Sequence, residues 1–406
     1  MPGFHICWAA NADGVAGGGE KLGNCISLPC CYNSKKTAFP QQGDYRMLSD
    51  RFCKTLIELV SIPSTSGHEE HIRNYLELRL AALGLATHVD TAGNLIATLA
   101  GEGKPLLLNA HMDRVPPGRG HQPILRDDVL YSDGTTNLGA DDAAGIAIIL
   151  EILTQLVRGQ SRHPPIIVVF TVQEEVGMSG AAAFDPSPWH VTDGIVFDNA
   201  FEAGVVVSQG AAYEAFDVQI TGRTGHPGKD LAHTVNAIEI FRHVDYPHGS
   251  LSADQTRILI GRISGGSARN AIPASAYIEG ELRSFEPAEK RLDYMNSIRV
   301  AFEQTALRFG GRAEVSFKTH ATGYRVGDDE LLLKAYREVL AQRGAQLEMR
   351  PTFIGSDASS FRPEVKAFTI STGVVNEHST EEYVPLAPLG QVVEDTLQML
   401  EMLTGL

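Results

Sequence analysis

Short apolar runs that end close to acidic or histidine residues restrict what this chain can fold into. The run Ile166 to Val172 has the length and composition of a buried strand, and Glu174 and Glu175 follow it almost at once. Two adjacent carboxylates at a strand end repel each other and resist burial unless a positive charge lies beside them. A bound metal ion would supply that charge.

Further candidate ligands follow other apolar runs. In open α/β sheets, sites form outside the carboxyl ends of the strands. We therefore expect separate strands to bring side chains that are distant in sequence to one place. Besides the acidic pair, the set comprises His111 after Leu106–Leu108, Asp141 after Leu138–Ala140, Asp198 after Gly194–Phe197, and His378 in a loop after Phe368–Ile370.

Helical and strand-like patterns alternate from Ser49 onward. This alternation predicts an α/β fold with a mixed, largely parallel central sheet flanked by helices. A capping box at Ser66–Glu69 is expected to open a helix that ends at Gly84. Other helices are expected at 52–60, 143–157, 329–342 and 390–403, and strands at 86–90, 94–99, 105–109, 166–172, 194–197 and 367–371.

The middle of the chain has a different pattern, which predicts an inserted α+β lid domain. Strands at 212–220, 258–263, 274–285 and 313–319 and helices at 233–244 and 287–309 follow the β-α-β-β-α-β order of a ferredoxin-like fold. The predicted division is an irregular or disordered extension (1–45), a catalytic domain in two parts (46–210 and 323–406), and an inserted lid and dimerisation domain (211–322).

Composition excludes several classes of function. The net charge of -15 argues against a nucleic-acid binder, and no apolar run is long enough to span a membrane. A cytoplasmic location is expected because no basic segment precedes an apolar one at the N-terminus, and Met47 is an alternative start. Four of the five cysteines lie in the first 31 residues without a C-x-x-C pair, so we expect free thiols, with metal binding as the alternative.

The residue types indicate the chemistry. Two imidazoles with several carboxylates suit zinc, with manganese or cobalt as alternatives. Two such ions would hold a bridging water as nucleophile, with Asp141 as the bridging carboxylate, although an acid at this position also fits a helix cap. Asp113 is expected to orient His111. Of Glu174 and Glu175, one should bind metal and the other should take the proton from the water.

Several ordered motifs carry a resemblance to a known family. The chain resembles the zinc-dependent exopeptidases that include peptidase T, carboxypeptidase G and the aminoacylases, and most of all the peptidase T-like branch. The resemblance covers essentially everything from about Met47 to the C-terminus. The matching stretches are Asn109–Asp113, Gly139–Asp142, Glu174–Gly177, Gly225–Gly228, Asn270–Pro273 and Glu377–His378.

The resemblance implies a role for each matching residue. Glu174 would be the general base, the Asp141–Asp142 peptide would be cis, and the family's usual Lys is replaced by Ala143. His226 would steady the oxyanion, often from the lid of the partner subunit, while Asn270 and Arg283 would grip the substrate carboxylate. One zinc would bind His111, Asp141 and Asp198, and the other Asp141, Glu175 and His378.

The expected function is hydrolysis of amide bonds in short peptides by a two-zinc exopeptidase similar to tripeptide aminopeptidases. An N-acyl amino acid amidohydrolase or a carboxypeptidase with the same site is the nearest alternative. A metal- or peptide-binding protein without activity is less consistent with Glu174, since a binder needs ligands but no base. A dimetal phosphoesterase would need more cationic groups than Arg269 and Arg283 around the site.

Overall fold

The computed structural model describes residues 43–159, 161–229, 231–362 and 364–404. Gly43–Leu406 forms one compact unit. Helix α1 (Gly43–Val60) includes residues 43–45 of the segment predicted to be irregular, and the rest of that segment, with its four cysteines, lies outside the described residues. Cys53, in α1, is a buried free thiol. No helix within the described ranges is long and apolar enough to cross a membrane.

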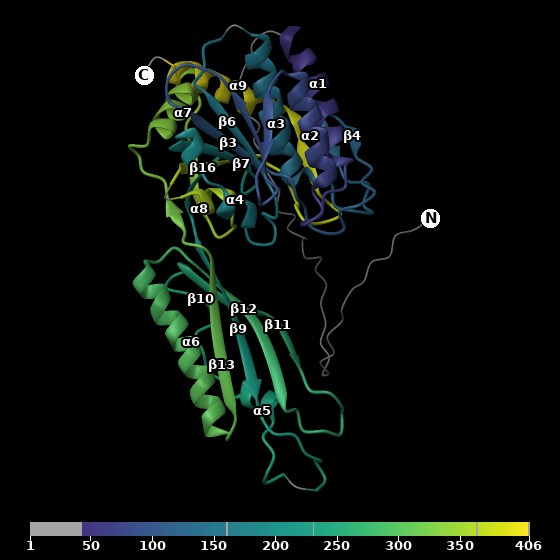
Figure 1. Cartoon of the computed structure of the whole chain (residues 1–406), viewed down its shortest axis with the longest axis vertical. Coiled ribbons are helices and arrows are strands. Elements are labelled where there is room, and N and C mark those ends of the chain that lie inside the picture. Colours follow the sequence, from purple (N-terminus) through teal and green to yellow (C-terminus); the bar gives the residue numbers. More distant parts are fainter. Residues whose placement is uncertain (1–42, 160, 230, 363, 405–406) are drawn as a thin grey trace, which may run out of the picture. The chain divides into compact units, whose positions relative to one another are not determined.

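A nine-stranded mixed sheet forms the centre of this unit (Figure 1). Its strands are β1 (Ala86–Val89), β2 (Leu95–Leu99), β3 (Leu106–His111), β6 (Ile166–Thr171), β7 (Asp193–Asp198), β8 (Val206–Gly210), β14 (Tyr324–Arg325), β15 (Met349–Thr352) and β16 (Lys366–Ser371). The order is β1-β2-β6-β3-β7-β16-β8-β14, with β15 paired to β8. The central strands β6, β3, β7 and β16 run parallel, so their carboxyl ends meet at one edge.

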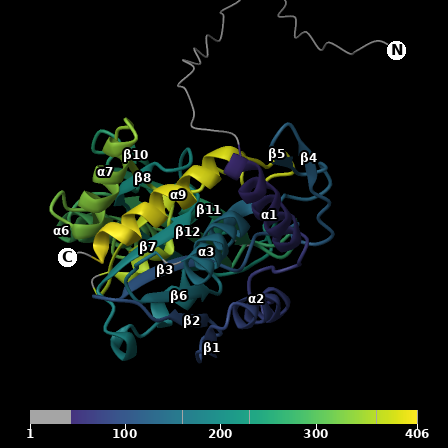
Figure 2. The ribbon, with the colours of Figure 1, turned by 90° about the horizontal axis from the view of Figure 1, so that it is seen from above.

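Helices flank this sheet (Figure 2). They are α2 (Glu70–Ala82), α3 (Ala140–Arg158), α4 (Ser179–Ala183), α7 (Leu331–Gln342), α8 (Asp357–Phe361) and α9 (Leu386–Leu403), with a 3-10 turn at Ser187–Trp189. Helix α3 packs on β3 and β7, and both α1 and α9 pack on α3. Because α3 is covered on both sides, nearly all of its residues from Ala140 to Leu156 are buried.

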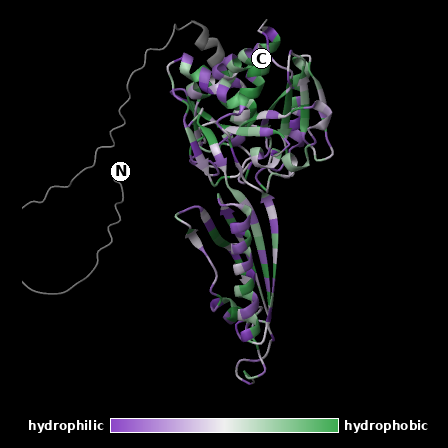
Figure 3. Cartoon of the chain, turned by 90° about the vertical axis from the view of Figure 1, so that its left-hand side faces the viewer, coloured by the Kyte–Doolittle hydropathy of each residue, from purple (hydrophilic) through white to green (hydrophobic). Residues whose placement is uncertain are grey.

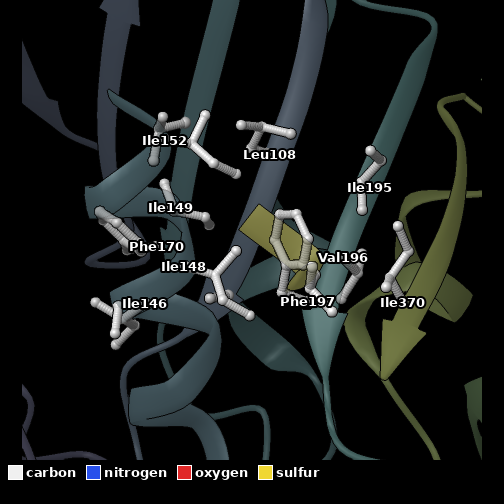
Figure 4. Packing of buried hydrophobic residues seen from close by; sticks show 14 of the residues in the cluster. Leu108, Ile146, Ile148, Ile149, Ile152, Phe170, Ile195, Val196, Phe197 and Ile370 are labelled. Atoms are coloured by element: carbon white, nitrogen blue, oxygen red, sulfur yellow. The ribbon is translucent and has the colours of Figure 1, made fainter. Parts of the chain in front are cut away.

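The main hydrophobic core lies between α3 and the parallel strands. Figure 4 shows Ile148 of α3 beside Phe197 of β7, and Phe197 pairs with Ile370 of β16 in the sheet. All six residues of β6 are buried, as expected for a strand covered on both faces. Full burial of each such aliphatic or aromatic side chain contributes about 1.5–3 kcal/mol, so this core fixes the strand ends that follow it.

A small three-stranded sheet lies beside the central one. It contains β4 (Ile124–Arg126), β5 (Val129–Tyr131) and β17 (Tyr383–Pro385), in the order β17-β5-β4. The ladder is extended by Ser132, whose N–H donates to the carbonyl oxygen of Glu382 at 2.9 Å. Tyr131 and Tyr383 stack with their ring centroids 5.4 Å apart. These contacts fix the backbone of Glu382, which has a role in the site.

The middle of the chain forms a separate five-stranded antiparallel sheet with its own hydrophobic core. Its elements are β9 (Ala212–Thr221), α5 (Ala237–Arg242), β10 (Gly249–Leu251), β11 (Thr256–Gly265), β12 (Ser275–Ser284), α6 (Ala288–Arg308) and β13 (Arg312–Ala321). The strand order is β10-β11-β12-β9-β13. Figure 3 shows many hydrophilic residues along α6, whose other face buries Ile298 and Phe302. The predicted fold class, a mixed α/β sheet with a ferredoxin-like insert, is confirmed.

Two local predictions were wrong. The helix expected at 233–244 spans only Ala237–Arg242, because the Asn236 side chain accepts from the N–H groups of Ile238 and Glu239 and begins the helix there. The capping box at Ser66–Glu69 does not form, since α2 has no side-chain cap. The Ser66 hydroxyl instead donates to Asp113 Oδ2 at 2.6 Å, a contact across the fold that local sequence does not show.

Candidate metal centre

The ends of three parallel strands and one helix bring the predicted ligands together. His111 is the last residue of β3, Asp198 is the last of β7, Asp141 lies at the start of α3, and Glu175 follows β6. The His111, Asp141 and Asp198 side chains form one group, in which every pair of ligand atoms lies within 4.8 Å. His111 Nε2 is 3.5 Å from Asp141 Oδ1 and 3.8 Å from Asp198 Oδ1.

A second group shares Asp141 with the first. It contains Asp141, Glu175 and His378, again within 4.8 Å of one another. His378 Nε2 lies 3.4 Å from Asp141 Oδ2 and 2.9 Å from Glu175 Oε1. His378 comes from the loop after β16, so the two groups draw on five segments of the chain. The five residues therefore lie together as the sequence predicted.

Asp113 joins the His111 strand to the Glu174 loop. Its carboxylate accepts from the N–H groups of Glu174 at 2.8 Å and Glu175 at 3.2 Å, in addition to the Ser66 hydroxyl. His111 Nδ1 is 2.9 Å from the Asp113 carbonyl oxygen but 3.5 Å from its carboxylate. The backbone of Asp113 thus fixes the imidazole tautomer that leaves Nε2 facing the cluster, while its side chain holds the glutamate loop.

The start of α3 is irregular. The Asp141–Asp142 peptide is cis, as the resemblance implied, and both residues have non-helical backbone angles. Asp142 Oδ1 accepts from Gly145 N at 2.9 Å and Oδ2 accepts from His111 N at 3.2 Å. Asp142 therefore caps the regular part of the helix and ties it to β3, whereas Asp141 projects into the cluster.

Burial and the charges of neighbouring groups shift the pKa values of the acids in this cluster. Burial raises the pKa values of Glu174 and Asp198 well above their usual range, with further contributions from neighbouring carboxylates. Burial also opposes ionisation of Asp141, but His111 and His378 outweigh it and hold its pKa at about 2. Two imidazoles are too few to balance this many buried acids, so a bound cation would stabilise the cluster.

The residues present fit metal ions. Asp141 belongs to both groups of candidate ligands, and its Oδ1 atom is buried without a hydrogen-bond partner. Two imidazoles and three carboxylates form a nitrogen and oxygen donor set of the kind that zinc, manganese or cobalt accepts. Glu174 lies outside both groups, beside Glu175, which belongs to one of them. The Glu174 carboxylate therefore lies next to the cluster but is not one of the candidate metal ligands.

Two further buried acids, Glu382 and Asp357, lie near this cluster and have no role predicted from the sequence. Glu382 accepts from four backbone N–H groups at the start of α3. Asp357 accepts from the Thr171 hydroxyl and from Asn109 Nδ2 at 3.3 Å, behind the ends of β3 and β6. Neither acid follows an apolar run that would have marked it as a ligand.

The predicted substrate-binding residues fall into two places on the inserted sheet. Arg283 lies near the end of β12, where it donates to the carbonyl oxygen of Phe353 at 2.8 Å and to Glu281 Oε1 at 2.9 Å. His226 and Asn270 lie in loops at the other end, where Ile272 N donates to Gly225 O at 3.0 Å. The length of β12 separates the two places by about 25–30 Å.

His226 and Asn270 lie at the end of the inserted sheet that is far from Arg283. Within the described residues, no hydrogen bond or ion pair links His226 or Asn270 to the metal cluster. Both side chains are exposed, and His226 Nδ1 accepts from Gly228 N at 3.1 Å. Their proposed roles therefore depend on something other than contacts within this one chain.

Comparison with known proteins agrees with this chemistry. The chain matches peptidase family M20/M25/M40 over residues 107–402. It is 30% identical to the protein YqjE of Bacillus subtilis over 364 residues, which cover 86% of this chain and 98% of that protein. It is 24% identical to peptidase T of Streptococcus thermophilus over 382 residues, 82% of this chain and 91% of that protein.

Solved structures show the same relationship. The aminopeptidase PepT from Bacillus cereus is 28% identical with a TM-score of 0.79, and the match covers 87% of this chain and 98% of PepT. A tripeptidase from Staphylococcus aureus is 30% identical with a TM-score of 0.83, covering 88% and 99%. The family match includes the ends of β3, β6, β7 and β16 on which the candidate ligands lie. The chain therefore belongs to peptidase family M20/M25/M40 and is a metallopeptidase that hydrolyses peptide bonds.

Proposed function

We propose that this chain is a two-zinc exopeptidase that releases the N-terminal residue of tripeptides and similarly short peptides. The observation that carries the proposal is the pair of imidazole–carboxylate groups that share Asp141, with Glu174 alongside. The likeness over nearly the full length of an aminopeptidase and a tripeptidase supports this choice of substrate. A cytoplasmic location, predicted from the sequence, is part of the same proposal.

One cation would be held by His111, Asp141 and Asp198, and the other by Asp141, Glu175 and His378. Zinc is the proposed ion, with manganese or cobalt as substitutes of similar donor preference. When bound, the two cations would polarise the scissile carbonyl group and lower the pKa of a water molecule between them. Asp113 would fix the position of the His111 ring relative to the loop that carries Glu174 and Glu175.

Glu174 is the proposed general base. Its backbone N–H is held by Asp113 Oδ1 at 2.8 Å, and its carboxylate is not part of either ligand group. Glu174 would take a proton from the attacking water and deliver it to the leaving amine. A binding protein without activity would have no use for such an uncoordinated acid.

The inserted sheet would complete the substrate site. Arg283 lies on the end of β12 next to the Phe353 loop, with its guanidinium 4.3 Å from the centroid of the Tyr213 ring, and is proposed to bind the substrate carboxylate. The loops of His226 and Asn270 lie at the far end of the same sheet. We therefore propose that these two residues serve the site of a partner chain in a homodimer formed through the inserted domain.

The proposed domain division is the one predicted from sequence. Residues 46–210 and 323–406 would form the catalytic domain, and residues 211–322 the inserted domain. The two separate sheets and two separate hydrophobic cores support these boundaries. Phe216 and Phe302 belong to one core, whereas Phe197 and Phe368 belong to the other.

A combined measurement of metal content and products tests the proposal. Full-length protein is loaded with zinc, its bound metal is counted, and it is given one tripeptide in free, N-acylated and C-amidated forms. We expect two zinc ions per chain, release of the N-terminal residue from the free peptide, and no cleavage of the N-acylated form. Preferential cleavage of the N-acylated form would instead assign an amidohydrolase or carboxypeptidase, and lack of any cleavage would refute the proposal.

A further inference from the structure

Glu382 makes a set of contacts that the proposed mechanism does not use. Its side chain is 1% exposed, and it lies four residues after His378. Oε2 accepts from the N–H groups of Leu138 at 2.8 Å and Gly139 at 3.0 Å. Oε1 accepts from those of Ala140 at 2.8 Å and Asp141 at 3.2 Å. A single carboxylate thus takes four successive backbone donors.

These donors would otherwise be unsatisfied. The first N–H groups of a helix have no partner within it, and a side chain at the N-cap usually accepts from them. Gly139 is at the N-cap of α3 and has no side chain, while Asp142 caps the regular helix further on. Glu382, distant in sequence, therefore supplies the acceptor that α3 lacks locally.

The charge of Glu382 is balanced by a buried guanidinium. Arg114 is 2% exposed and lies under Gly139, where an added Cβ atom would be 2.7 Å from Arg114 Nη1. Burial lowers the pKa of Arg114 to about 10, and the charge of Glu382 counteracts this. The Arg114 guanidinium also donates to the carbonyl oxygens of Val60 and Leu59. Arg114 thus links the segment after β3 to the end of α1 and places a positive charge near Glu382.

The contacts connect two ligands of the proposed second cation. Glu382 binds the backbone N–H of Asp141, and its own backbone is four residues from His378 and is held by Ser132 N at 2.9 Å. Asp141 Oδ2 and His378 Nε2 lie 3.4 Å apart. His111 and Asp198, in contrast, are fixed by β3 and β7 within the central sheet.

We propose that Glu382 is a positioning residue that holds the His378 loop against the start of α3, and so sets the geometry of the second cation site. This inference rests on the proposed metal sites. Without the Glu382 carboxylate, the loop of His378 loses its attachment to the backbone at the start of α3, while the first group keeps two ligands on the sheet. Loss of this carboxylate should therefore weaken binding of the second cation more than binding of the first.

The test compares metal binding in three variants of the full chain. Glu382→Gln replaces one acceptor oxygen with an NH2 group that would face N–H donors. Glu382→Asp keeps the charge but shortens the side chain by one CH2, so it cannot reach all four donors. Glu381→Gln is the control, because Glu381 is the adjacent acid and is exposed.

Zinc affinity is measured stepwise on metal-free protein with a competing chelator, and cobalt absorption spectra report the coordination of each equivalent. We expect Glu382→Gln and Glu382→Asp to weaken the second equivalent by about tenfold or more, the range found when groups that support metal ligands are removed. The first equivalent, and both equivalents in Glu381→Gln, should remain close to those of the natural protein.

Three results would overturn the inference. Unchanged stepwise affinities in both Glu382 variants would show that the contact does not position the site. Equal weakening of both equivalents, with or without a loss of stability of the metal-free protein, would assign Glu382 to general folding. Failure of the natural protein to bind two equivalents would overturn the proposed function as well, which distinguishes the two.

Discussion

Replacement of Gly145 by alanine should disrupt the start of α3. An added Cβ atom would lie 2.5 and 2.6 Å from the two carboxylate oxygens of Asp142 and 2.7 Å from the carbonyl oxygen of Phe197. The Phe197 carbonyl belongs to a buried strand and cannot move away easily. To reach an ordinary contact distance, the helix must shift from β7 by roughly 0.7 Å, against close packing on both sides.

The expected loss of stability combines two opposing terms. Alanine should favour a helix interior over glycine by about 0.8–1.0 kcal/mol. Overpacking should remove about 1–3 kcal/mol, and disturbance of the Asp142 hydrogen bonds to His111 and Gly145 a further ~1–2 kcal/mol. We therefore expect Gly145→Ala to lower the free energy of unfolding by about 1–4 kcal/mol.

Gly390→Ala provides a matched control. Gly390 is in the interior of α9, and an added Cβ atom there meets nothing within 4 Å. This variant should therefore gain about 0.5–1 kcal/mol from the same change of residue. The difference between the unfolding free energies of the two variants therefore measures the cost of the close approach of α3 to β7, because the change from glycine to alanine is common to both.

Urea unfolding and zinc titration check both variants. Because Asp141 lies at the shifted end of α3, the peptidase activity of Gly145→Ala should fall by at least about tenfold, consistent with the sensitivity of reacting groups to displacements of under 1 Å. If Gly145→Ala were as stable as Gly390→Ala and bound zinc as well as the natural protein, the packing argument would be refuted.

Three further predictions concern the site. Glu174→Gln should lower kcat by about 10²–10⁴-fold with two zinc ions still bound, whereas Glu175→Gln should lose one zinc ion. Equal loss of metal in both variants would show that Glu174 is a ligand. Removal of metal by a chelator should lower the unfolding temperature, and zinc at 100 times its Kd should restore about 2.7 kcal/mol, while an unchanged temperature would argue against structural coupling of the cluster. Arg283→Met should raise KM for peptides with a free carboxyl end by about tenfold but hardly affect C-amidated peptides, and equal effects on both would contradict carboxylate binding.

The central sheet and the ligand positions could be predicted because they depend on local patterns. A buried parallel strand such as Ile166–Thr171 is a continuous apolar run, and the residue that follows it lies at the edge where sites form. Each of the five candidate ligands follows such a run or begins the helix after one. Their convergence follows from the parallel order of the strands.

Contacts between distant segments were not predictable in this way. Glu382 accepts from residues more than 240 positions earlier, and Ser66 donates to Asp113 instead of capping its own helix. The predicted helix around α5 was also too long, since Val235, just before Asn236, forms an isolated antiparallel bridge with Arg223 instead of a helical turn. In each case a partner elsewhere in the fold replaced the local one.

The length of the inserted strands has a mechanical consequence. The chain enters this sheet at Ala212 and leaves it at Ala321, which lie at the same end because β13 pairs with the start of β9. The ten-residue strands then extend about 30 Å to the His226 and Asn270 loops. A rotation of about 10° at the attached end would sweep these loops through roughly 5 Å, more than the length of a hydrogen bond. Small changes of backbone angle at the two adjacent connections would therefore produce large displacements of the loops at the far end.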